Sequence, residues 1–253
     1  MLKELAPGLK ITLAFTLLTG LLYPAVMTAL SSVIFPHQAN GSLVTVNGKV
    51  VGSSLIGQSF SKPEYFHPRP SSAGNGYDAT NSSGSNLGPT SAKLLHGTTK
   101  TDDKGKEIVD FDGIEDRIVH YCVENDIAFT SSSSLDAFKD NQGNLDDVKL
   151  IKAFNDQKNP LMFTPKVQIP ADAVTASASG LDPNISPANA DLQIGRVAKA
   201  RGIAPNEVKE LISQATQHPA LGFIGEPRVN VLLVNLALDE KFPPRKQALA
   251  GAR

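Results

Sequence analysis

The stretch "ITLAFTLLTGLLYPAVMTALSSVIFP", from Ile11 to Pro36, decides the architecture of this chain. It exceeds the about 20 apolar residues that a helix needs to cross the hydrocarbon of a bilayer. No Lys, Arg, Asp or Glu occurs between Lys10 and Lys49. So long an uncharged run is rare in the core helix of a soluble domain, and a cleaved signal peptide has an apolar region of only about 7–15 residues. We therefore predict an uncleaved transmembrane helix over residues 11–36.

Positive charge lies on the amino-terminal side of this predicted span. Lys3, Lys10 and the free amino terminus precede it, and no Lys or Arg follows it closely. The positive-inside rule then places residues 1–10 in the cytoplasm and residues 37–253 outside. The sequence predicts a single-pass membrane protein with an extracytoplasmic main domain.

Small or weakly polar residues recur at every fourth position of the predicted span. They are Thr12, Thr16, Gly20, Pro24, Thr28 and Ser32. In lipid, helices associate through close backbone approach and interhelical hydrogen bonds, which such residues permit. A chance spacing in a plain anchor is the alternative. We predict that this row packs against a membrane partner.

The sequence after the span predicts an α+β domain. Alternating apolar and polar residues around Asn47-Gly48 predict a β-hairpin. The stretch Ser61–Thr90 is rich in Gly, Ser, Asn and Pro, which predicts a long loop. Residues from about 98 to 165 are polar and suggest a solvated insertion with one short helix at "GIEDRIVHYCVEND". Residues 165–180 predict extended chain.

Two helices and a strand are predicted near the end of the chain. Ser186 and Pro187 form an N-cap and a first-turn proline for a helix that stops at Gly202. The next helix, "PNEVKELISQATQ", places Val208, Leu211, Ile212 and Ala215 on one face. The run "RVNVLLVNLALD", Arg228–Asp239, is apolar on both faces and predicts a central strand.

Composition excludes several classes of function. A formal net charge of -1 gives no basic stripe for nucleic acid. The single cysteine, Cys122, excludes an intramolecular disulfide and a multi-cysteine zinc site. The five histidines show no metal-ligand spacing, so the sequence predicts no metal site. They are His37, His67, His96, His120 and His218.

Short motifs do not point to catalysis either. Gly48-Lys49 is followed by Val50, where a phosphate loop needs Ser or Thr. In "GSNLG", Gly84–Gly88, the serine is one place too early for a nucleophile elbow. The stretch "VTASASGLDPNISP" contains Ser177 and Ser179 without a nearby base, and its residues are typical of turns. We predict no catalytic residue.

Seven segments carry a resemblance to a known family. They are "LTGLLYPAVMT", "FPHQANGSL", "GSSLIGQSF", "YFHPRPSS", "YDATNSSGSNLGPT", "VTASASGLDPNISPANADLQIGRVAKARG" and "GEPRVNVLLVNLALD". In this order, over about two thirds of the chain, they resemble the C subunit of the bacterial Kdp potassium-transporting P-type ATPase. The segment from about residue 98 to 165 is longer than the resemblance leads us to expect.

The resemblance implies a non-catalytic accessory subunit of an ATP-driven, high-affinity potassium uptake complex. Its partners would be a channel-like potassium-binding subunit and an ATP-hydrolysing P-type subunit. The C subunit of that family crosses the bacterial inner membrane once, supports assembly and acts as a catalytic chaperone that raises the ATP affinity of the hydrolysing subunit. Potassium would be the transported ion, and the chain would have no cofactor of its own.

The orientation and the family's link to ATP conflict, because an extracytoplasmic domain meets no cellular ATP. If nucleotide binds, glycine-rich amides and an amide side chain are its expected contacts. These candidates are Ser83, Gly84, Ser85, Asn86 and Gln193. The residues that we expect at a partner interface are His67, Arg69, Ser177, Ser179 and Asp182.

Two other classes of function stay open at the level of sequence. The first is a membrane-anchored extracytoplasmic hydrolase that uses Ser177 or Ser179 with His67 or His218 as the base. The second is a small-anion-binding module centred on Arg69, whose guanidinium suits bidentate pairing. The plain alternative for Arg69 is that it tethers its loop to the rest of the domain.

Overall fold

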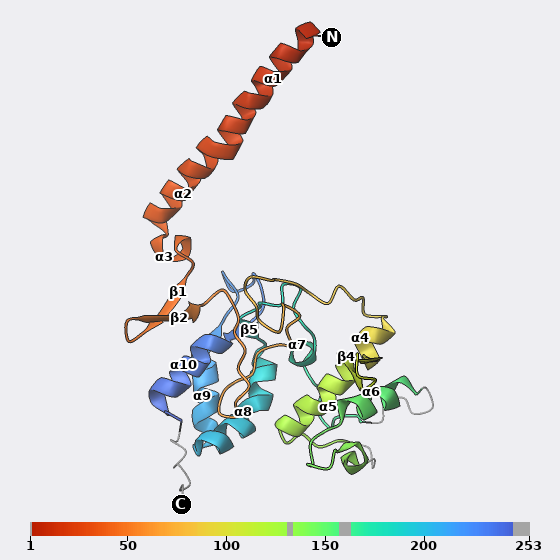
Figure 1. The fold of residues 1–253 in the computed structure, drawn as a ribbon. Helices are drawn as coiled ribbons and strands as arrows, with labels where there is room; N and C mark the ends of the chain where they lie inside the picture. The colour runs from red at the N-terminus through yellow and green to blue at the C-terminus, as the bar shows by residue number, and fades with distance from the viewer. Residues whose placement is uncertain (1, 131–133, 157–162, 245–253) are drawn as a thin grey trace, which may run out of the picture. The chain divides into compact units, whose positions relative to one another are not determined.

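The computed structural model describes residues 2–130, 134–156 and 163–244. The chain divides into two compact units, Met1–Leu55 and Ile56–Arg253. The first holds one long apolar helix and the second a mixed helix-and-sheet domain (Figure 1). This confirms an apolar amino-terminal helix followed by an α+β domain.

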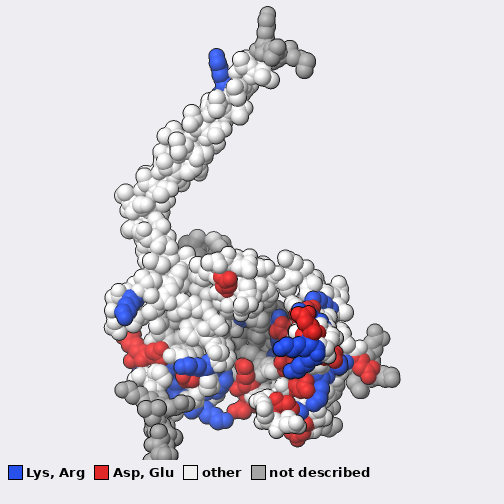
Figure 2. Space-filling view, viewed as in Figure 1, with Lys and Arg blue, Asp and Glu red and all other residues white. Residues whose placement is uncertain are grey.

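The helix of the first unit consists of α1 (Leu2–Leu17), a π-helical turn η1 (Leu18–Leu22) and α2 (Tyr23–Ile34). Leu5–Ile34 is long and apolar enough to cross a membrane, and none of its most apolar stretch is buried within the chain. Figure 2 shows this helix almost free of acidic and basic side chains beyond its amino-terminal end. Because the exposed apolar surface has no partner within the described chain, a bilayer is the environment that suits it.

The π turn has a local cause. Pro24 has no N–H and its ring would crowd the carbonyl one turn earlier, which disturbs a regular α-helix. The backbone widens just before it, and the Tyr23 N–H donates to the Leu18 carbonyl five residues back. A π turn takes more residues per turn than an α turn, so side chains four apart drift less around the axis. Thr16, Gly20 and Pro24 therefore lie more nearly in line than in a regular helix.

The predicted hairpin is confirmed. After a short helix, α3 (Pro36–Ala39), strands β1 (Leu43–Val46) and β2 (Lys49–Ser53) pair antiparallel. The two turn residues, Asn47 and Gly48, both have positive φ, at 50° and 77°. This is the backbone conformation that an Asn-Gly hairpin turn requires.

The main core of the second unit lies among three helices and a small sheet. The helices are α8 (Pro187–Arg201), α9 (Pro205–Ala215) and α10 (Val231–Lys241). Helix α9 packs beside both α8 and α10 (Figure 1). The antiparallel sheet has the order β5-β7-β6, with strands Asn184–Ile185, Arg228–Asn230 and Thr216–Gln217.

The two predicted helices of this core are confirmed. The Ser186 hydroxyl accepts from the Asn189 N–H at 3.1 Å and Pro187 opens α8. Gly202 ends α8 with a left-handed φ of 67°, which glycine adopts without a Cβ penalty. On α9 the predicted face is buried at Val208, Leu211 and Ile212, with Ala215 packed at its edge.

The prediction of a long central strand at Arg228–Asp239 is wrong. Only Arg228–Asn230 are extended, and α10 follows directly. The Asn230 side chain accepts from the Leu233 N–H at 3.1 Å and caps the helix. Because a fully apolar run has neither a 2-residue nor a 3.6-residue period, a buried helix and a buried strand look alike in sequence. The prediction of extended chain at residues 165–180 is wrong in part, because Ala171–Val174 form a short helix, α7, within otherwise irregular chain.

The polar segment from about 98 to 165 holds regular structure and an apolar cluster of its own. After α4 (Ala92–His96) come a hairpin of β3 (Thr98–Thr101) and β4 (Glu107–Phe111), then α5 (Ile114–Glu124), the 3-10 turn η2 (Leu135–Phe138) and α6 (Asp147–Asn155). Helix α5 confirms the short helix that the sequence predicted. Val119, Leu150, Phe154 and Phe163 are buried together between these elements. Residues 131–133 and 157–162 of this segment lie outside the described residues. The segment is therefore solvated on its surface and packed inside.

Candidate functional site

A segment of the long loop, Pro63–His67, is held by side chains from two core helices. The predicted absence of regular structure is confirmed, since residues 54–91 of the described chain hold no helix or strand. Gln193 on α8 accepts from the His67 N–H at 2.7 Å and donates to the His67 carbonyl at 3.1 Å. Asn235 on α10 does the same for Phe66, at 2.8 and 3.0 Å. The side-chain amides thus replace the backbone partners that a strand would supply.

Two buried arginines on α8 hold the carbonyls of the same segment. Arg196 Nη1 donates to the carbonyls of Pro63 at 2.9 Å and Tyr65 at 2.8 Å. Arg201 Nε donates to the Glu64 carbonyl at 2.7 Å, and its Nη2 pairs with Asp239 at 2.8 Å. Burial lowers the pKa of Arg196. Because their donors are used inside the domain, these guanidinium groups stabilise the loop.

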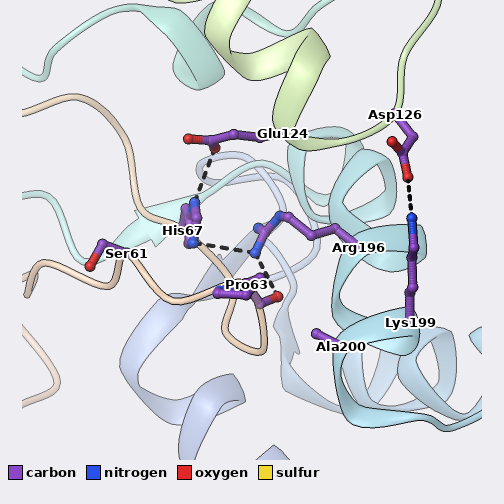
Figure 3. Close-up of a pocket in the computed structure, with 8 residues that line it drawn as sticks. All are labelled: Ser61, Pro63, His67, Glu124, Asp126, Arg196, Lys199 and Ala200. Carbon is purple, nitrogen blue, oxygen red and sulfur yellow. Dashed lines mark hydrogen bonds and ion pairs between the residues drawn. The ribbon is translucent and has the colours of Figure 1, made fainter. Parts of the chain in front are cut away.

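A pocket of about 440 Å³ opens beside this segment (Figure 3). In it, His67 Nδ1 lies 3.3 Å from Glu124 Oε2, and Arg196 Nη1 lies 3.2 Å from His67 Nε2. The hydrogen bond from His67 lowers the pKa of Glu124. At the rim, Lys199 pairs with Asp126 at 3.2 Å. The charged groups of the pocket are thus paired with one another, which favours structural cohesion over capture of a charged ligand.

The predicted nucleotide contact Gln193 lies inside the domain. It is 1% exposed, and besides His67 it contacts Arg196 through Oε1 at 2.6 Å and Asn189 through Nε2 at 2.9 Å. An amide has two donors and one acceptor oxygen with two lone pairs. All four are used here, so no group of Gln193 is left for a nucleotide in this structure.

The predicted loop residues Ser83 and Gly84 pack against the serine-rich stretch that follows α7. The Ser83 N–H donates to the Ser179 carbonyl at 3.0 Å. A Cβ on Gly84 would lie 2.7 Å from the Ala178 carbonyl oxygen, and one on Gly180 would lie 2.5 Å from that of Ser83. The small residues of both loops therefore allow backbone to meet backbone. Ser85 and Asn86 continue this loop, Asn86 with a positive φ of 53°.

Arg69 and Asp182, both predicted at a partner interface, contact each other. Arg69 Nη1 lies 2.9 Å from Asp182 Oδ2, and Arg69 Nε points at the Thr175 carbonyl at 3.4 Å. Asp182 Oδ1 also accepts from the Asn184 N–H at 3.0 Å, as its turn chemistry predicts. This geometry favours the reading in which Arg69 tethers its loop to the rest of the domain. Because its guanidinium pairs with Asp182, it does not support an anion-binding module centred on Arg69.

The hydrolase alternative finds no support either. Ser177 Oγ lies 3.4 Å from Ser179 Oγ, and in the described chain neither hydroxyl contacts a histidine. His67 is engaged with Glu124, Arg196 and the Lys62 carbonyl. No base among the described residues is positioned to take a proton from either serine.

The row of small residues on the apolar helix is exposed along its length. Its six members are all exposed: Thr12, Thr16, Gly20, Pro24, Thr28 and Ser32. The Thr12 hydroxyl donates to the Gly8 carbonyl at 3.0 Å, one turn earlier. A Cβ on Gly20 would have no atom within 4 Å. The side chains of the row are thus small, and the Thr12 hydroxyl is hydrogen-bonded within its own helix. Both features allow another helix to pack closely against this row.

Sequence reasoning missed Arg196, Asn235 and Glu124 as parts of this network. A signal for Arg196 was present, because it follows Gln193 by about one turn of the predicted helix and adjoins the apolar Val197. A charged residue at a core position is seldom buried without a partner. For Glu124, the partner comes from a loop that only the tertiary fold brings near.

Comparison with known proteins identifies the family. Residues 5–138 and 139–240 match the family described as KdpC: K+-transporting ATPase, c chain. The chain belongs to the KdpC family. The potassium-transporting ATPase KdpC subunits of Caulobacter vibrioides (strain NA1000 / CB15N) and Beijerinckia indica are 45% and 44% identical over 245 and 243 residues, covering 96% of both chains. That of Mycobacterium bovis (strain BCG / Pasteur 1173P2) is 41% identical over 239 residues, 94% of this chain and 99% of its own. KdpC-family relatives thus match this chain over nearly their whole length.

Proposed function

We propose that this chain is a non-catalytic accessory subunit of an ATP-driven potassium uptake complex. The observation that carries this proposal is the family match across the helix and the folded domain together. The relatives are named as subunits of a potassium-transporting ATPase. ATP hydrolysis belongs to a partner subunit, and potassium is the transported ion rather than a cofactor of this chain.

The helix Leu5–Ile34 holds the subunit in the membrane and contacts a channel-like partner through the row that contains Gly20. Lys3 and Lys10 keep the amino terminus in the cytoplasm, and the domain from Ile56 onward lies outside. His67, Arg69, Ser177, Ser179 and Asp182 are carried by loops that the buried network holds in place. The role of the outer domain is positional: it docks on the channel-like subunit and shapes the approach of the ion.

The subunit also raises the ATP affinity of the hydrolysing partner, and it does so through the assembly rather than by holding nucleotide itself. The buried, fully bonded Gln193 and the packed loop at Ser83 and Gly84 support this reading. ATP is confined to the cytoplasm, whereas the proposed position of the domain is outside.

The test is affinity isolation of the tagged full chain from membranes of potassium-starved cells, with the partners identified by mass. We expect a channel-like subunit and a P-type ATPase in comparable amounts. ATP hydrolysis is then measured with and without this chain, and its removal is expected to raise the KM for ATP. Isolation of the chain without either partner would contradict the proposal.

A further inference from the structure

One oxygen of a buried carboxylate in the α5–α6 region lacks a hydrogen-bond partner. Asp116, on α5, has a side chain that is 4% exposed. Among the residues that the structure describes, its Oδ1 has no hydrogen-bond partner. A buried carboxylate oxygen without a hydrogen-bond partner costs free energy. Such a group needs either a proton or a cation.

Two further ligand-type side chains face this carboxylate. His120 follows Asp116 by one turn of α5, with Nε2 3.9 Å from Asp116 Oδ2. Asp147, the first residue of α6, places Oδ1 2.8 Å from the same nitrogen. The three candidate ligand atoms all lie within 4.8 Å of one another. Ligands about 2.1 Å from a tetrahedral ion lie about 3.4 Å apart, so small side-chain rotations would suffice to close the set on an ion.

Arg117, the cation next to Asp116 in the chain, bonds other groups. Arg117 Nε and Nη2 pair with the two oxygens of Asp112 at 2.7 and 2.9 Å. Its Nη1 donates to the Val174 carbonyl at 3.2 Å. The guanidinium therefore donates to Asp112 and Val174, and none of these hydrogen bonds reaches the Asp116 carboxylate.

We propose that Asp116, His120 and Asp147 bind a divalent zinc-type cation that ties α5 to α6. One imidazole nitrogen and two carboxylate oxygens form a ligand set that zinc accepts, with a water molecule for the fourth position. The ion would join parts of the chain that are separated by the loop between Glu124 and Asp147, and it would brace the region next to the apolar cluster around Phe163. Sequence spacing did not show this site, because the third ligand comes from another helix.

The test uses the untagged full chain in detergent, stripped with a chelator, with Zn²⁺ as the only added ion. Thermal unfolding and titration calorimetry are measured at one pH. Zn²⁺ at a hundredfold excess over its Kd is expected to raise Tm by about 5 °C or more. Asp116→Asn and Asp147→Asn are expected to abolish both the shift and the one-to-one binding heat.

A matched control lies on the same helix. Glu115 Oε2 contacts His96 Nδ1 at 2.7 Å, a second carboxylate–histidine pair without a third ligand among the described residues. Glu115→Gln is expected to keep the full Zn²⁺ effect. Asp147 is a surface residue with a 41% exposed side chain, so Asp147→Asn reports on the site even if Asp116→Asn does not fold. Absence of a shift in the wild type, or an equal shift in Asp147→Asn, would overturn the proposal.

Discussion

Gln193 holds both backbone groups of His67, accepting from its N–H at 2.7 Å and donating to its carbonyl at 3.1 Å. One side chain of α8 thereby fixes the path of a loop that has no regular structure. The same amide also bonds Arg196 and Asn189. A residue that sequence reasoning assigned to a ligand is, in the folded chain, the centre of an internal network.

Replacing Gln193 is expected to destabilise the domain. Gln193→Ala leaves the His67 backbone groups and one Arg196 donor without partners, which we expect to lower the free energy of unfolding by about 2–4 kcal/mol. The measurement is denaturant unfolding of the full chain in detergent. The control is Gln214→Ala, whose exposed amide bonds Glu210 on the surface of α9 and should cost less than about 0.5 kcal/mol. Equal stability of the two variants would argue against the network.

The contact between His67 and Glu124 predicts a pH dependence. The pKa of Glu124 lies below its ordinary 4.5 because His67 donates a hydrogen bond to the carboxylate. The contribution of Glu124 to stability is therefore present above pH 4.5 and is lost as the pH falls through the lowered folded-state pKa. Since the Glu124 side chain is 49% exposed, solvent screens the interaction.

We expect Glu124→Gln to lower stability by about 0.5–1 kcal/mol at pH 7 and to match the wild type near pH 3. Thermal unfolding between pH 3 and pH 7 measures this. Glu210→Gln, at an exposed position of α9, serves as the control and should run parallel to the wild type over the whole range. A constant difference for Glu124→Gln at every pH would rule out the charge as its cause.

The close contact of the two serine-rich loops is tested at Gly180. Its φ is +67°, and a Cβ there would lie 2.5 Å from the Ser83 carbonyl oxygen and 2.7 Å from the Ala73 nitrogen. Gly105 has a similar φ of +78° but open space around it. Gly105→Ala therefore measures backbone strain alone, at about 1–2 kcal/mol.

We expect Gly180→Ala to cost at least about 1 kcal/mol more than Gly105→Ala, because the loops must separate to admit the methyl group. Denaturant unfolding of both variants gives the comparison. If the two substitutions cost the same, backbone docking between Ser83 and Gly180 does not contribute to stability.

Features with a local physical cause were predictable from sequence. Asn47-Gly48 specify a turn, Ser186 and Gly202 cap a helix, and a long uncharged run marks the apolar helix. In contrast, the run that contains Leu233 was assigned to a strand, because its apolar residues lack a period and only the Asn230 cap marks the helix start.

The network around the pocket depends on residues that are distant in sequence. Phe66 bonds Asn235 and His67 bonds Gln193, although the partners are 169 and 126 positions apart in sequence. No local sequence pattern encodes either pair. Arg69 illustrates the reverse case, since the plain reading of it as a tether agrees with its pairing to Asp182. Residue type alone could not separate a ligand-binding amide from a buried structural one.

Membrane packing is tested at Gly20. A Cβ there would have no neighbour within 4 Å, so Gly20→Leu should not disturb the isolated chain. If the row of small residues contacts a partner helix, the added bulk should reduce co-purification with the channel-like subunit severalfold. Ala14→Leu adds similar bulk two residues away from Thr12 and Thr16, on another face, and should leave recovery unchanged. Normal recovery with Gly20→Leu would remove this face from the interface.

The position of the folded domain outside the cytoplasm is the central claim of this account. The native thiol gives little background, because Cys122 is fully buried and burial raises its pKa to about 11. Ser213, exposed on α9, offers a site for a reporter cysteine in Ser213→Cys. Spheroplasts that carry this variant are treated with a membrane-impermeant thiol reagent before and after lysis. We predict full labelling before lysis, whereas labelling that occurs only after lysis would place the domain in the cytoplasm, beside ATP, and contradict the account.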